Sequence, residues 1–242
     1  MRTKRYGGME LAVIDRDDAD TDYIYSEVFL SQIYYHPEMK IRKYPVVIDV
    51  GANIGIYSIW AHRRYQPFQI FAYEASPRTY GYLVDNVARN VDPETTRIMP
   101  INRAVASRSG QKLVLHQSTS VSGISTLLER ESVGWVERAA ESLGLETHEV
   151  LTTTLSDEIA THGLEQVDVL KIDVEGYFLE VLAGLSDADF AKVRNVVVEV
   201  DYLPETGIGP FAVEDLLKSK GFTTDCLDRS QPNNLTFYAW RG

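Results

Sequence analysis

Carboxylates follow two apolar stretches of the chain, at points where buried strands would end. Asp173 and Glu175 close the run VDVLKIDVEG, and Glu199 and Asp201 close the run NVVVEVD. The carboxyl ends of parallel strands meet at one edge of a sheet, so we expect these side chains to lie near one another. Each pair is two residues apart, and in extended backbone that spacing places both side chains on one face. Acids so placed can accept a proton from a hydroxyl, with Asp173 the first candidate and Glu175 and Glu199 the next.

The same acids suggest a second kind of chemistry. Asp173, Glu199 and Asp201 offer only oxygen atoms, the ligands that Mg²⁺ prefers, and a bound metal would lower the pKa of a hydroxyl. Carboxylates at strand ends are also common without a metal, so both interpretations stay open and no metal is assigned. No two of the five histidines have the spacing of a metal-binding pair, but His36 and His116 are further candidates for a general base.

A glycine-rich turn follows an earlier apolar run, in VVIDVGANIGIYS (Val46–Ser58). Gly51 and Gly55 permit a tight turn and close approach of backbone to a ligand at the start of a helix. A dinucleotide fingerprint begun at Gly51 would need glycines at Asn53 and Ile56, and a phosphate-binding loop fails as well. Because the turn contains no Lys or Arg, it favours a nucleoside that carries an amino acid, such as S-adenosylmethionine.

An acid stands where such a ligand needs one. Glu74 ends the next predicted strand, and a carboxylate there can accept hydrogen bonds from both ribose hydroxyls. NAD-dependent enzymes share this feature, so Glu74 favours S-adenosylmethionine over NAD only in combination with the glycine turn. Asp49, at the end of the first strand, is expected near the ammonium group of the ligand, directly or through water. Glu74 can also stabilise the helix that begins at Ser76 and Pro77, and the two roles are compatible.

These residues need a scaffold of alternating strands and helices, which the hydrophobic pattern predicts. Strands of continuous apolar residues belong to parallel sheets covered on both faces. The last two strands are joined by a turn-rich segment without a helix, so the final strand should be antiparallel. The predicted fold is therefore α/β, a Rossmann-like doubly wound sheet of seven strands, mostly parallel, with an antiparallel last strand and an insertion between the third and fourth strands. The predicted strands lie at 46–48, 69–73, 97–101, 167–172, 195–200, 222–227 and 235–240, and the predicted helices at 56–65, 76–87, 178–185 and 213–220.

Two segments outside this repeat are expected to bind the substrate. Residues 1–45 are predicted to form a helical cap, because Val28, Phe29, Ile33 and Tyr34 follow helical spacing behind Ser26, after an acidic loop at 15–22. Residues 46–242 form the main domain, with the insertion at about 103–154. The insertion contains strand-like pieces at 112–116 and 149–153, a Ser/Gly segment at 118–126 and an amphipathic helix at 132–143. The candidate substrate-binding residues are Tyr34, Ser122 and Ser125.

Composition narrows the class of protein. The chain has 242 residues and a formal net charge of −11, which argues against binding to polyanions such as nucleic acid or an anionic membrane. Its one cysteine, Cys226, excludes a disulfide framework and a cysteine-based zinc site. Neither a signal peptide nor a membrane-spanning run is seen, so a cytoplasmic protein acting on a small molecule is expected. Nothing predicts the oligomeric state.

Taken together, the motifs resemble the FkbM family of methyltransferases. The resemblance runs from about Tyr23 to Val200 through the glycine turn, YEASP (Tyr73–Pro77), the Asn102–Ala104 segment and VVVEV, and LKIDVEG (Leu170–Gly176) is its most family-specific piece. It implies S-adenosylmethionine as methyl donor and transfer to a hydroxyl on a secondary metabolite or glycan. It also implies that Glu74 contacts the ribose, that Asn102 and Ala104 lie near the adenine, and that 122–126 is a family Ser/Gly stretch. The candidate donor-binding residues are Asp49, Gly51, Ala52, Asn53, Gly55, Tyr57, Ser58, Glu74, Ala75, Asn102, Ala104 and Asp173.

The expected function is therefore O-methylation of a small hydroxylated acceptor. Nothing in the sequence identifies the acceptor atom, so N- or C-methylation by the same fold stays open. An NAD-dependent oxidoreductase and a non-catalytic donor-binding domain are the more distant alternatives.

Overall fold

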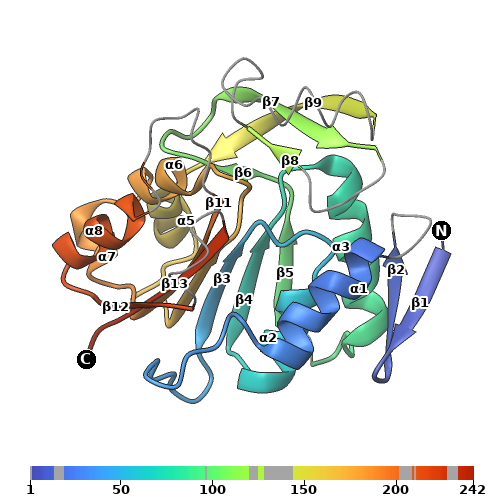
Figure 1. The fold of residues 1–242 in the computed structure, drawn as a ribbon, viewed down its shortest axis with the longest axis horizontal. Coiled ribbons are helices and arrows are strands. Elements are labelled where there is room, and N and C mark those ends of the chain that lie inside the picture. The colour runs from blue at the N-terminus through green and yellow to red at the C-terminus, as the bar shows by residue number, and fades with distance from the viewer. Residues whose placement is uncertain are drawn as a thin grey trace.

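The computed structural model describes residues 2–13, 19–95, 97–119, 125–127, 144–201, 209, 211–227 and 234–242. Its centre is a seven-stranded sheet in the order β12-β13-β11-β10-β3-β4-β5 (Figure 1). Neighbouring strands are parallel except β13, which is antiparallel to β11 and to β12. This confirms the predicted doubly wound sheet with one antiparallel strand. The strands are β3 (Val46–Val50), β4 (Gln69–Tyr73), β5 (Ile98–Ile101), β10 (Val169–Ile172), β11 (Asn195–Asp201), β12 (Thr223–Cys226) and β13 (Asn234–Trp240).

Helices cover both faces of this sheet. Successive residues of each central strand point to opposite sides, so each strand packs against helices on both faces. Val47 packs with α2 and α3, whereas Ile48 packs with the helices of the other face. Ser76 caps α3, since its hydroxyl accepts a hydrogen bond from the Thr79 amide at 3.1 Å. The first face carries α2 (Ile56–Tyr65) and α3 (Pro77–Asn90), and the second carries α5 (Leu155–Thr161), α6 (Phe178–Ala183), α7 (Asp187–Phe190) and α8 (Ala212–Ser219).

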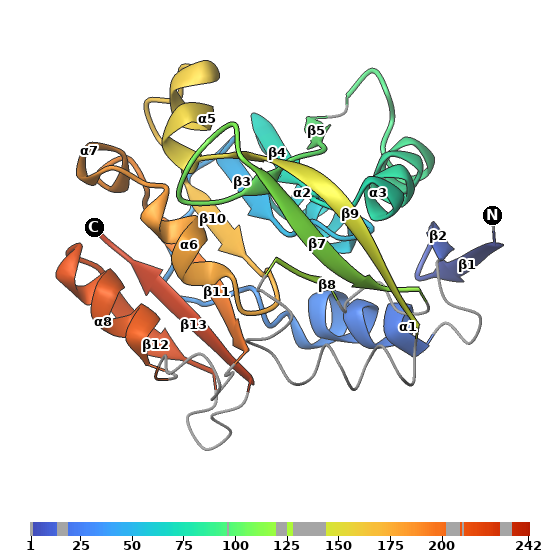
Figure 2. The same cartoon turned by 90° about the horizontal axis from the view of Figure 1, so that it is seen from above.

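The insertion forms a second, smaller sheet in the order β6-β9-β7-β8. Figures 1 and 2 show β7 and β9 lying across the end of the central sheet where its parallel strands finish. The predicted strand pieces are confirmed, although the second begins earlier than expected, at Leu145. The predicted helix at 132–143 lies outside the described residues. The strands are β6 (Ala104–Val105), β7 (Lys112–Ser118), β8 (Ser125–Thr126) and β9 (Leu145–Thr153).

The N-terminal segment begins with a hairpin that the sequence analysis did not anticipate. Strands β1 (Arg2–Tyr6) and β2 (Met9–Val13) pair antiparallel, and β2 packs against α3 at the side of the molecule (Figure 1). The side-chain amide of Asn86 pairs with β2, accepting from the Ala12 amide at 2.5 Å and donating to the Ala12 carbonyl at 3.2 Å. Asn90 repeats this pattern one turn later, so the edge of β2 is covered by helix side chains.

The helix after the hairpin also differs from its prediction. It starts at Ala19 as α1 (Ala19–Tyr25) and continues as a π-helix, η1 (Ser26–Ser31). The predicted acidic loop is therefore wrong for Ala19–Asp22, which are helical. Gln32 adopts a left-handed conformation (φ 51°) and ends the helix, so Tyr34 lies beyond it. No helix among the described residues is long and apolar enough to cross a bilayer.

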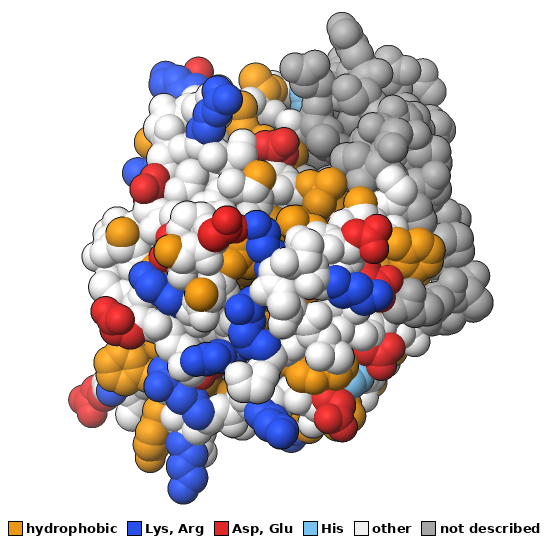
Figure 3. Space-filling model, turned by 90° about the vertical axis from the view of Figure 1, so that its left-hand side faces the viewer, with side chains coloured by type: hydrophobic (Ala, Val, Ile, Leu, Met, Phe, Trp, Pro, Cys, Tyr) orange, Lys and Arg blue, Asp and Glu red, His pale blue; other side chains and the backbone are white. Residues whose placement is uncertain are grey.

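One face of the molecule carries many basic side chains despite the acidic composition (Figure 3). Figure 3 shows the face that lies on the left of Figure 1, where Lys and Arg side chains gather among scattered acids. Acidic side chains gather instead inside the cavity described next.

Candidate functional site

A cavity of about 390 Å³ opens where β3, β4, β10 and β11 end. The small sheet of the insertion closes it on one side, and α1 with η1 closes it on another. This is the edge at which open α/β sheets bind their ligands. The predicted residues that line it are Tyr34, Gly51, Ala52, Asn53, Tyr57, Glu74, Ala75, Ala104, Ser125, Asp173, Glu175, Glu199 and Asp201.

Other predicted residues do not reach the cavity. Asp49, Gly55, Ser58 and Asn102 lie behind its wall, and Ser122 lies outside the described residues. The side-chain amide of Asn102 donates to the carbonyls of Glu74 and Ala75 at 2.8 and 3.0 Å. Asn102 therefore holds the chain that follows β4 in place and supports the wall that Ala75 lines.

The glycine turn is packed tightly against the end of β10. Gly51 has a φ of +74°, and its amide and that of Ala52 both donate to the Tyr73 carbonyl, at 3.0 and 2.9 Å. A Cβ on Gly51 would lie 1.7 Å from the carbonyl oxygen of Asp173. Gly55 serves a different contact, because a Cβ there would lie 2.7 Å from a methyl group of Leu83 on α3. The first glycine thus shapes the cavity, and the second lets α2 pack against α3.

Glu74 is buried with its carboxylate fixed by backbone. One oxygen accepts from the Asn53 amide at 2.9 Å and the other from the Ser76 amide at 2.8 Å. Burial raises the pKa of Glu74 to about 7, although these two hydrogen bonds work in the opposite direction. Each oxygen keeps a second lone pair, so the carboxylate can accept two more hydrogen bonds. The expected support of the α3 start and a role in ligand binding are both compatible with this geometry.

Asp49 and Lys171 form an ion pair under the cavity floor. Asp49 is fully buried, where it accepts from the Ser58 hydroxyl at 2.6 Å and lies 3.2 Å from Lys171 Nζ. Lys171 lines the cavity, donates to the Gly51 carbonyl at 2.8 Å and lies 3.3 Å from Asp173. Burial works to lower the pKa of Lys171, but Asp49 and Asp173 outweigh it and raise that pKa. Lys171 therefore stays charged between two acids.

Three groups meet at the opposite end of the cavity. The Tyr34 hydroxyl lies 2.8 Å from Glu199 Oε2 and 3.1 Å from Asp173 Oδ2. Tyr34 is only 5% exposed, although it comes from the N-terminal segment rather than from the sheet. Burial and then the charge of Asp173 raise the pKa of Glu199, and the same two causes raise the pKa of Asp201. Such a site can hold or accept a proton near neutral pH.

One expectation about these acids is correct and another is wrong. Glu199 and Asp201 both face the cavity from β11, as their spacing predicts for a strand. Asp173 and Glu175 do not share an extended face, because Glu175 (φ 48°) and Gly176 (φ 89°) turn the chain sharply toward α6. Glu175 still lines the cavity, and its carbonyl accepts from the Thr126 hydroxyl at 3.0 Å.

The geometry does not support the magnesium site. No group of three His, Cys, Asp or Glu side chains within the described part of the chain is arranged to hold a metal ion. The space between Asp173 and Glu199 is bridged by the Tyr34 hydroxyl. Asp173 and Glu199 are therefore held together by the Tyr34 hydroxyl.

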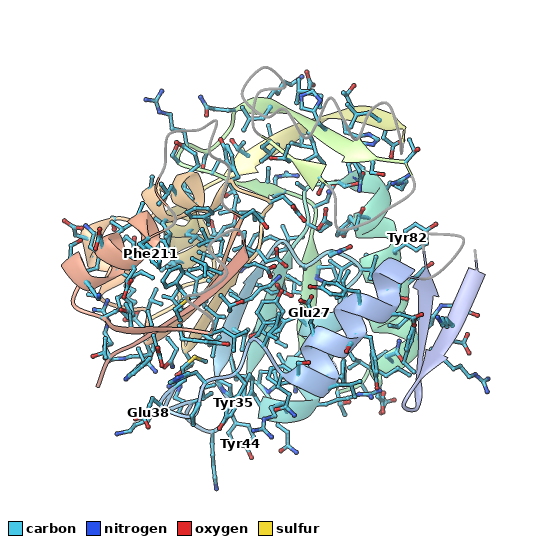
Figure 4. All side chains as sticks on the ribbon, viewed as in Figure 1. Glu27, Tyr35, Glu38, Tyr44, Tyr82 and Phe211 are labelled. Carbon is cyan, nitrogen blue, oxygen red and sulfur yellow. The ribbon has the colours of Figure 1, made fainter. Side chains whose placement is uncertain are left out.

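Sequence reasoning missed several residues of the cavity. Glu27, on the π-helix, lines it and is labelled at the centre of Figure 4. Tyr23 lies one helical turn earlier, and its hydrogen bond to Glu27 raises the pKa of Tyr23 to about 12. The four-residue spacing of Tyr23 and Glu27 was the sequence signal that they would be neighbours on one face of a helix. Neither candidate histidine lines the cavity: His36 stacks on Trp240 and packs at a tilt against Tyr238, and His116 lies within β7.

Comparisons with known proteins agree with this architecture. The model of the methyltransferase FkbM domain matches residues 49–224. Methyltransferase sdnD of Sordaria araneosa is 33% identical over 221 residues, which cover 84% of this chain and 82% of that protein. The 31-O-demethyl-FK506 methyltransferase FkbM of Streptomyces tacrolimicus is 29% identical over 225 residues, with 84% and 82% covered. The crystal structure of precorrin-6y C5,15-methyltransferase from Geobacter metallireducens GS-15 has a TM-score of 0.50 at 14% identity, covers 89% of this chain and 87% of that one, and shares the fold.

Proposed function

This chain belongs to the FkbM methyltransferase family, and on that premise we propose that it transfers a methyl group from S-adenosylmethionine to a hydroxyl of a small acceptor. One observation carries the proposal: a single cavity has a backbone-fixed carboxylate at one end, Glu74, and a hydroxyl-bridged pair of acids at the other, Asp173 and Glu199. The first end suits a ribose, and the second suits the removal of a proton.

The residues of the cavity fit the donor chemically. Glu74 would accept hydrogen bonds from the ribose hydroxyls, and the turn from Gly51 to Asn53 would place backbone against the ligand. The acids around Lys171 leave the cavity rich in negative charge, which complements a cationic ligand. When bound, the donor supplies an activated methyl group, and its sulfur becomes neutral once that group has left.

The chain itself has to orient the acceptor and remove its proton. Asp173 lines the cavity, and the Lys171 ammonium group lies 3.3 Å from its carboxyl. We assign Asp173 as the base that takes the hydroxyl proton, with Glu199 behind Tyr34 as the second acid. Ser125 at the insertion and Glu27 at the N-terminal segment would contact the acceptor, since both line the same cavity. In this proposal residues 1–45 act as the cap of the 46–242 domain.

The oxygen specificity and the small acceptor are proposed on two grounds. The cavity is enclosed by three parts of the chain, which suits a small molecule better than a polymer. The relative from Streptomyces tacrolimicus is named for a 31-O-demethyl substrate.

Binding and turnover can be tested separately. Calorimetric titration should show binding of S-adenosylmethionine and S-adenosylhomocysteine and none of NADH. Turnover is then measured with the tritium-labelled methyl donor and a panel of hydroxylated probes, namely sugars, hydroxy-amino acids and phenols, with matched amines. Labelled O-methyl products would support the proposal. Binding of NADH without binding of the donor would contradict it, and products labelled only on the amines would overturn the oxygen specificity.

A further inference from the structure

Tyr34 has one hydroxyl hydrogen but faces two carboxyl groups. Its hydroxyl lies within hydrogen-bond distance of two carboxyl groups, Glu199 at 2.8 Å and Asp173 at 3.1 Å. A hydroxyl has one hydrogen to donate, so it can donate to only one of the two. The other contact is favourable only if that carboxyl is protonated and donates to the Tyr34 oxygen. Asp173, Tyr34 and Glu199, here called the bridged acid pair, therefore hold one proton between the two carboxyls.

The surroundings indicate where that proton lies. Lys171 Nζ is 3.3 Å from Asp173, so this carboxyl has a cation beside it. Burial raises the pKa of Glu199, and the negative charges of Asp173, Asp201 and Glu27 raise it further. The shared proton is accordingly assigned to Glu199, and the Tyr34 hydroxyl then donates to Asp173.

The proton is held by electrostatics that a cationic ligand would change. A positive charge entering the cavity favours the ionised form of every carboxyl it faces. Tyr34 is only 5% exposed and Lys171 only 2%, so a charge placed beside them is weakly screened. Donor and product differ here by one charge, because the sulfur is cationic in S-adenosylmethionine and neutral in S-adenosylhomocysteine.

We propose that the bridged acid pair loses its shared proton when the cationic donor binds, and gains a proton from the acceptor hydroxyl during methyl transfer. The inference rests on the proposed function. Bonds and electrons balance in the transfer step: the acceptor O–H bond breaks, an O–C bond forms, and the electron pair of the C–S bond stays on sulfur. The acceptor proton goes to Asp173, from which it can pass to Tyr34 as the Tyr34 proton passes to Glu199. The additional negative charge of the bridged acid pair, which favours removal of the acceptor proton, is thus present only while the donor is bound.

Tyr34 itself lies outside the matched family domain of residues 49–224, and residues outside and inside that domain hold it in position. The Tyr238 hydroxyl donates to the Ile33 carbonyl at 2.5 Å, next to Tyr34 in the chain. The Tyr34 ring packs edge-on against Tyr57 at 5.3 Å between centroids and lies under Lys171 Nζ at 5.3 Å. These contacts fix the oxygen that bridges the two acids, so Tyr34 acts as a proton-relaying residue.

The test needs no knowledge of the acceptor. S-Adenosylmethionine and S-adenosylhomocysteine are each titrated into the protein by calorimetry at pH 7.5, in buffers of different ionisation enthalpy. The two ligands share the ribose, so proton linkage at Glu74 cancels in the comparison. The expected result is that the cationic ligand releases up to about one proton more than the neutral one. Equal proton release by both ligands overturns the inference and leaves the proposed function standing, whereas failure of both ligands to bind overturns the two together.

Variants assign the effect to the bridged acid pair. Glu199→Gln should abolish the difference in proton release, and Tyr34→Phe should reduce it. Tyr35→Phe is the matched control, because Tyr35 is the next residue and lies toward the edge that carries Glu38 and Tyr44 (Figure 4), outside the cavity lining. It should keep the full difference. A difference that survives Glu199→Gln, or that disappears in EDTA, would contradict the inference. If Tyr34→Phe fails to fold, Glu199→Gln decides.

Discussion

The Cα of Gly51 faces the backbone carbonyl of Asp173, so closely that a Cβ on Gly51 would lie 1.7 Å from that oxygen. This contact joins the two ends of the cavity. Gly51 begins the turn that would hold the donor, and Asp173 carries the carboxylate assigned as base. Parallel pairing of β3 with β10 sets their positions, since Val50 pairs with Ile172 and the Asp173 amide donates to the Val50 carbonyl at 3.0 Å.

Gly51→Ala should therefore damage both folding and donor binding. We expect a loss of about 3 kcal/mol or more in the free energy of unfolding, from strain at positive φ together with the clash. Gly110→Ala is the matched control, because Gly110 has the same φ of +74° but no atom of the described residues within 4 Å of its would-be Cβ. It should cost only about 1–2 kcal/mol and leave donor affinity intact. Urea denaturation and calorimetry measure the two effects, and equal costs for the two variants would disprove the role of the contact.

Glu74→Gln should weaken donor binding without unfolding the protein. The glutamine amide would turn an N–H group toward the amide of Asn53 or Ser76, both of which now donate to the carboxylate. Loss of charged hydrogen bonds to the ribose predicts a rise of roughly 10- to 100-fold in the Kd for S-adenosylhomocysteine. Glu94→Gln, on an exposed turn, should leave the Kd unchanged. Unchanged affinity in Glu74→Gln would remove this residue from the donor site.

Donor affinity should also depend on pH through Glu74. Burial raises its pKa to about 7, so the carboxyl becomes protonated as the pH falls below neutrality. A protonated carboxyl has one oxygen fewer to accept from the ribose, and the Kd for S-adenosylhomocysteine should therefore rise between pH 8 and pH 6. Titrations across this range measure the trend, and Glu74→Gln should flatten it. A Kd that is constant in the wild-type protein would contradict the assignment.

Methyl transfer should depend on Asp173 more than donor binding does. With an acceptor that supports turnover, Asp173→Asn should lower kcat by roughly 10²- to 10⁴-fold, because the base is lost while the shape of the side chain is kept. Affinity for S-adenosylhomocysteine should change much less, since the ribose contacts lie at Glu74. Rapid-quench kinetics and calorimetry separate the two quantities. Full activity of the variant would exclude Asp173 from the mechanism.

The sequence was most informative where a local pattern and the fold agree. The helix at 56–65 and the strand at 69–73 have their predicted bounds, because a glycine turn and a continuous apolar run define them. The hairpin was missed although Gly7 and Gly8, both with positive φ, form a recognisable two-residue turn. The local pattern could not show that Asp49 forms an ion pair with Lys171, since that pair depends on how strands distant in sequence align. It also could not place Tyr34 against Glu199, 165 residues away.

The docked hairpin gives a prediction about stability. Asn86 is fully buried and pairs with both backbone groups of Ala12, and its amide also donates to the Ile54 carbonyl at 2.8 Å in the glycine turn. Asn86→Ala leaves these groups without their partner and should cost about 2–4 kcal/mol in the free energy of unfolding. Val84→Ala, on the same helix at a position 39% exposed, should cost much less. Hydrogen exchange should show β2 opening first in Asn86→Ala, and unchanged protection of β2 would contradict the docking role.

The acids of the cavity should make the ligand-free protein less stable as the pH rises. Burial and mutual repulsion raise the pKa of Glu199 above its ordinary value, so between those two values the folded state binds more protons than the unfolded chain. Stability is then highest below the unfolded pKa and falls as the pH rises through the folded one. We expect Tm to fall from pH 6 to pH 9. Glu199→Gln cannot ionise and should raise Tm at pH 9 by a few degrees while changing it little at pH 5. Scanning calorimetry at both pH values checks this, with Glu149→Gln on the exposed side of β9 as control, and a Tm for Glu199→Gln that follows the wild type across the whole range would show that Glu199 titrates normally.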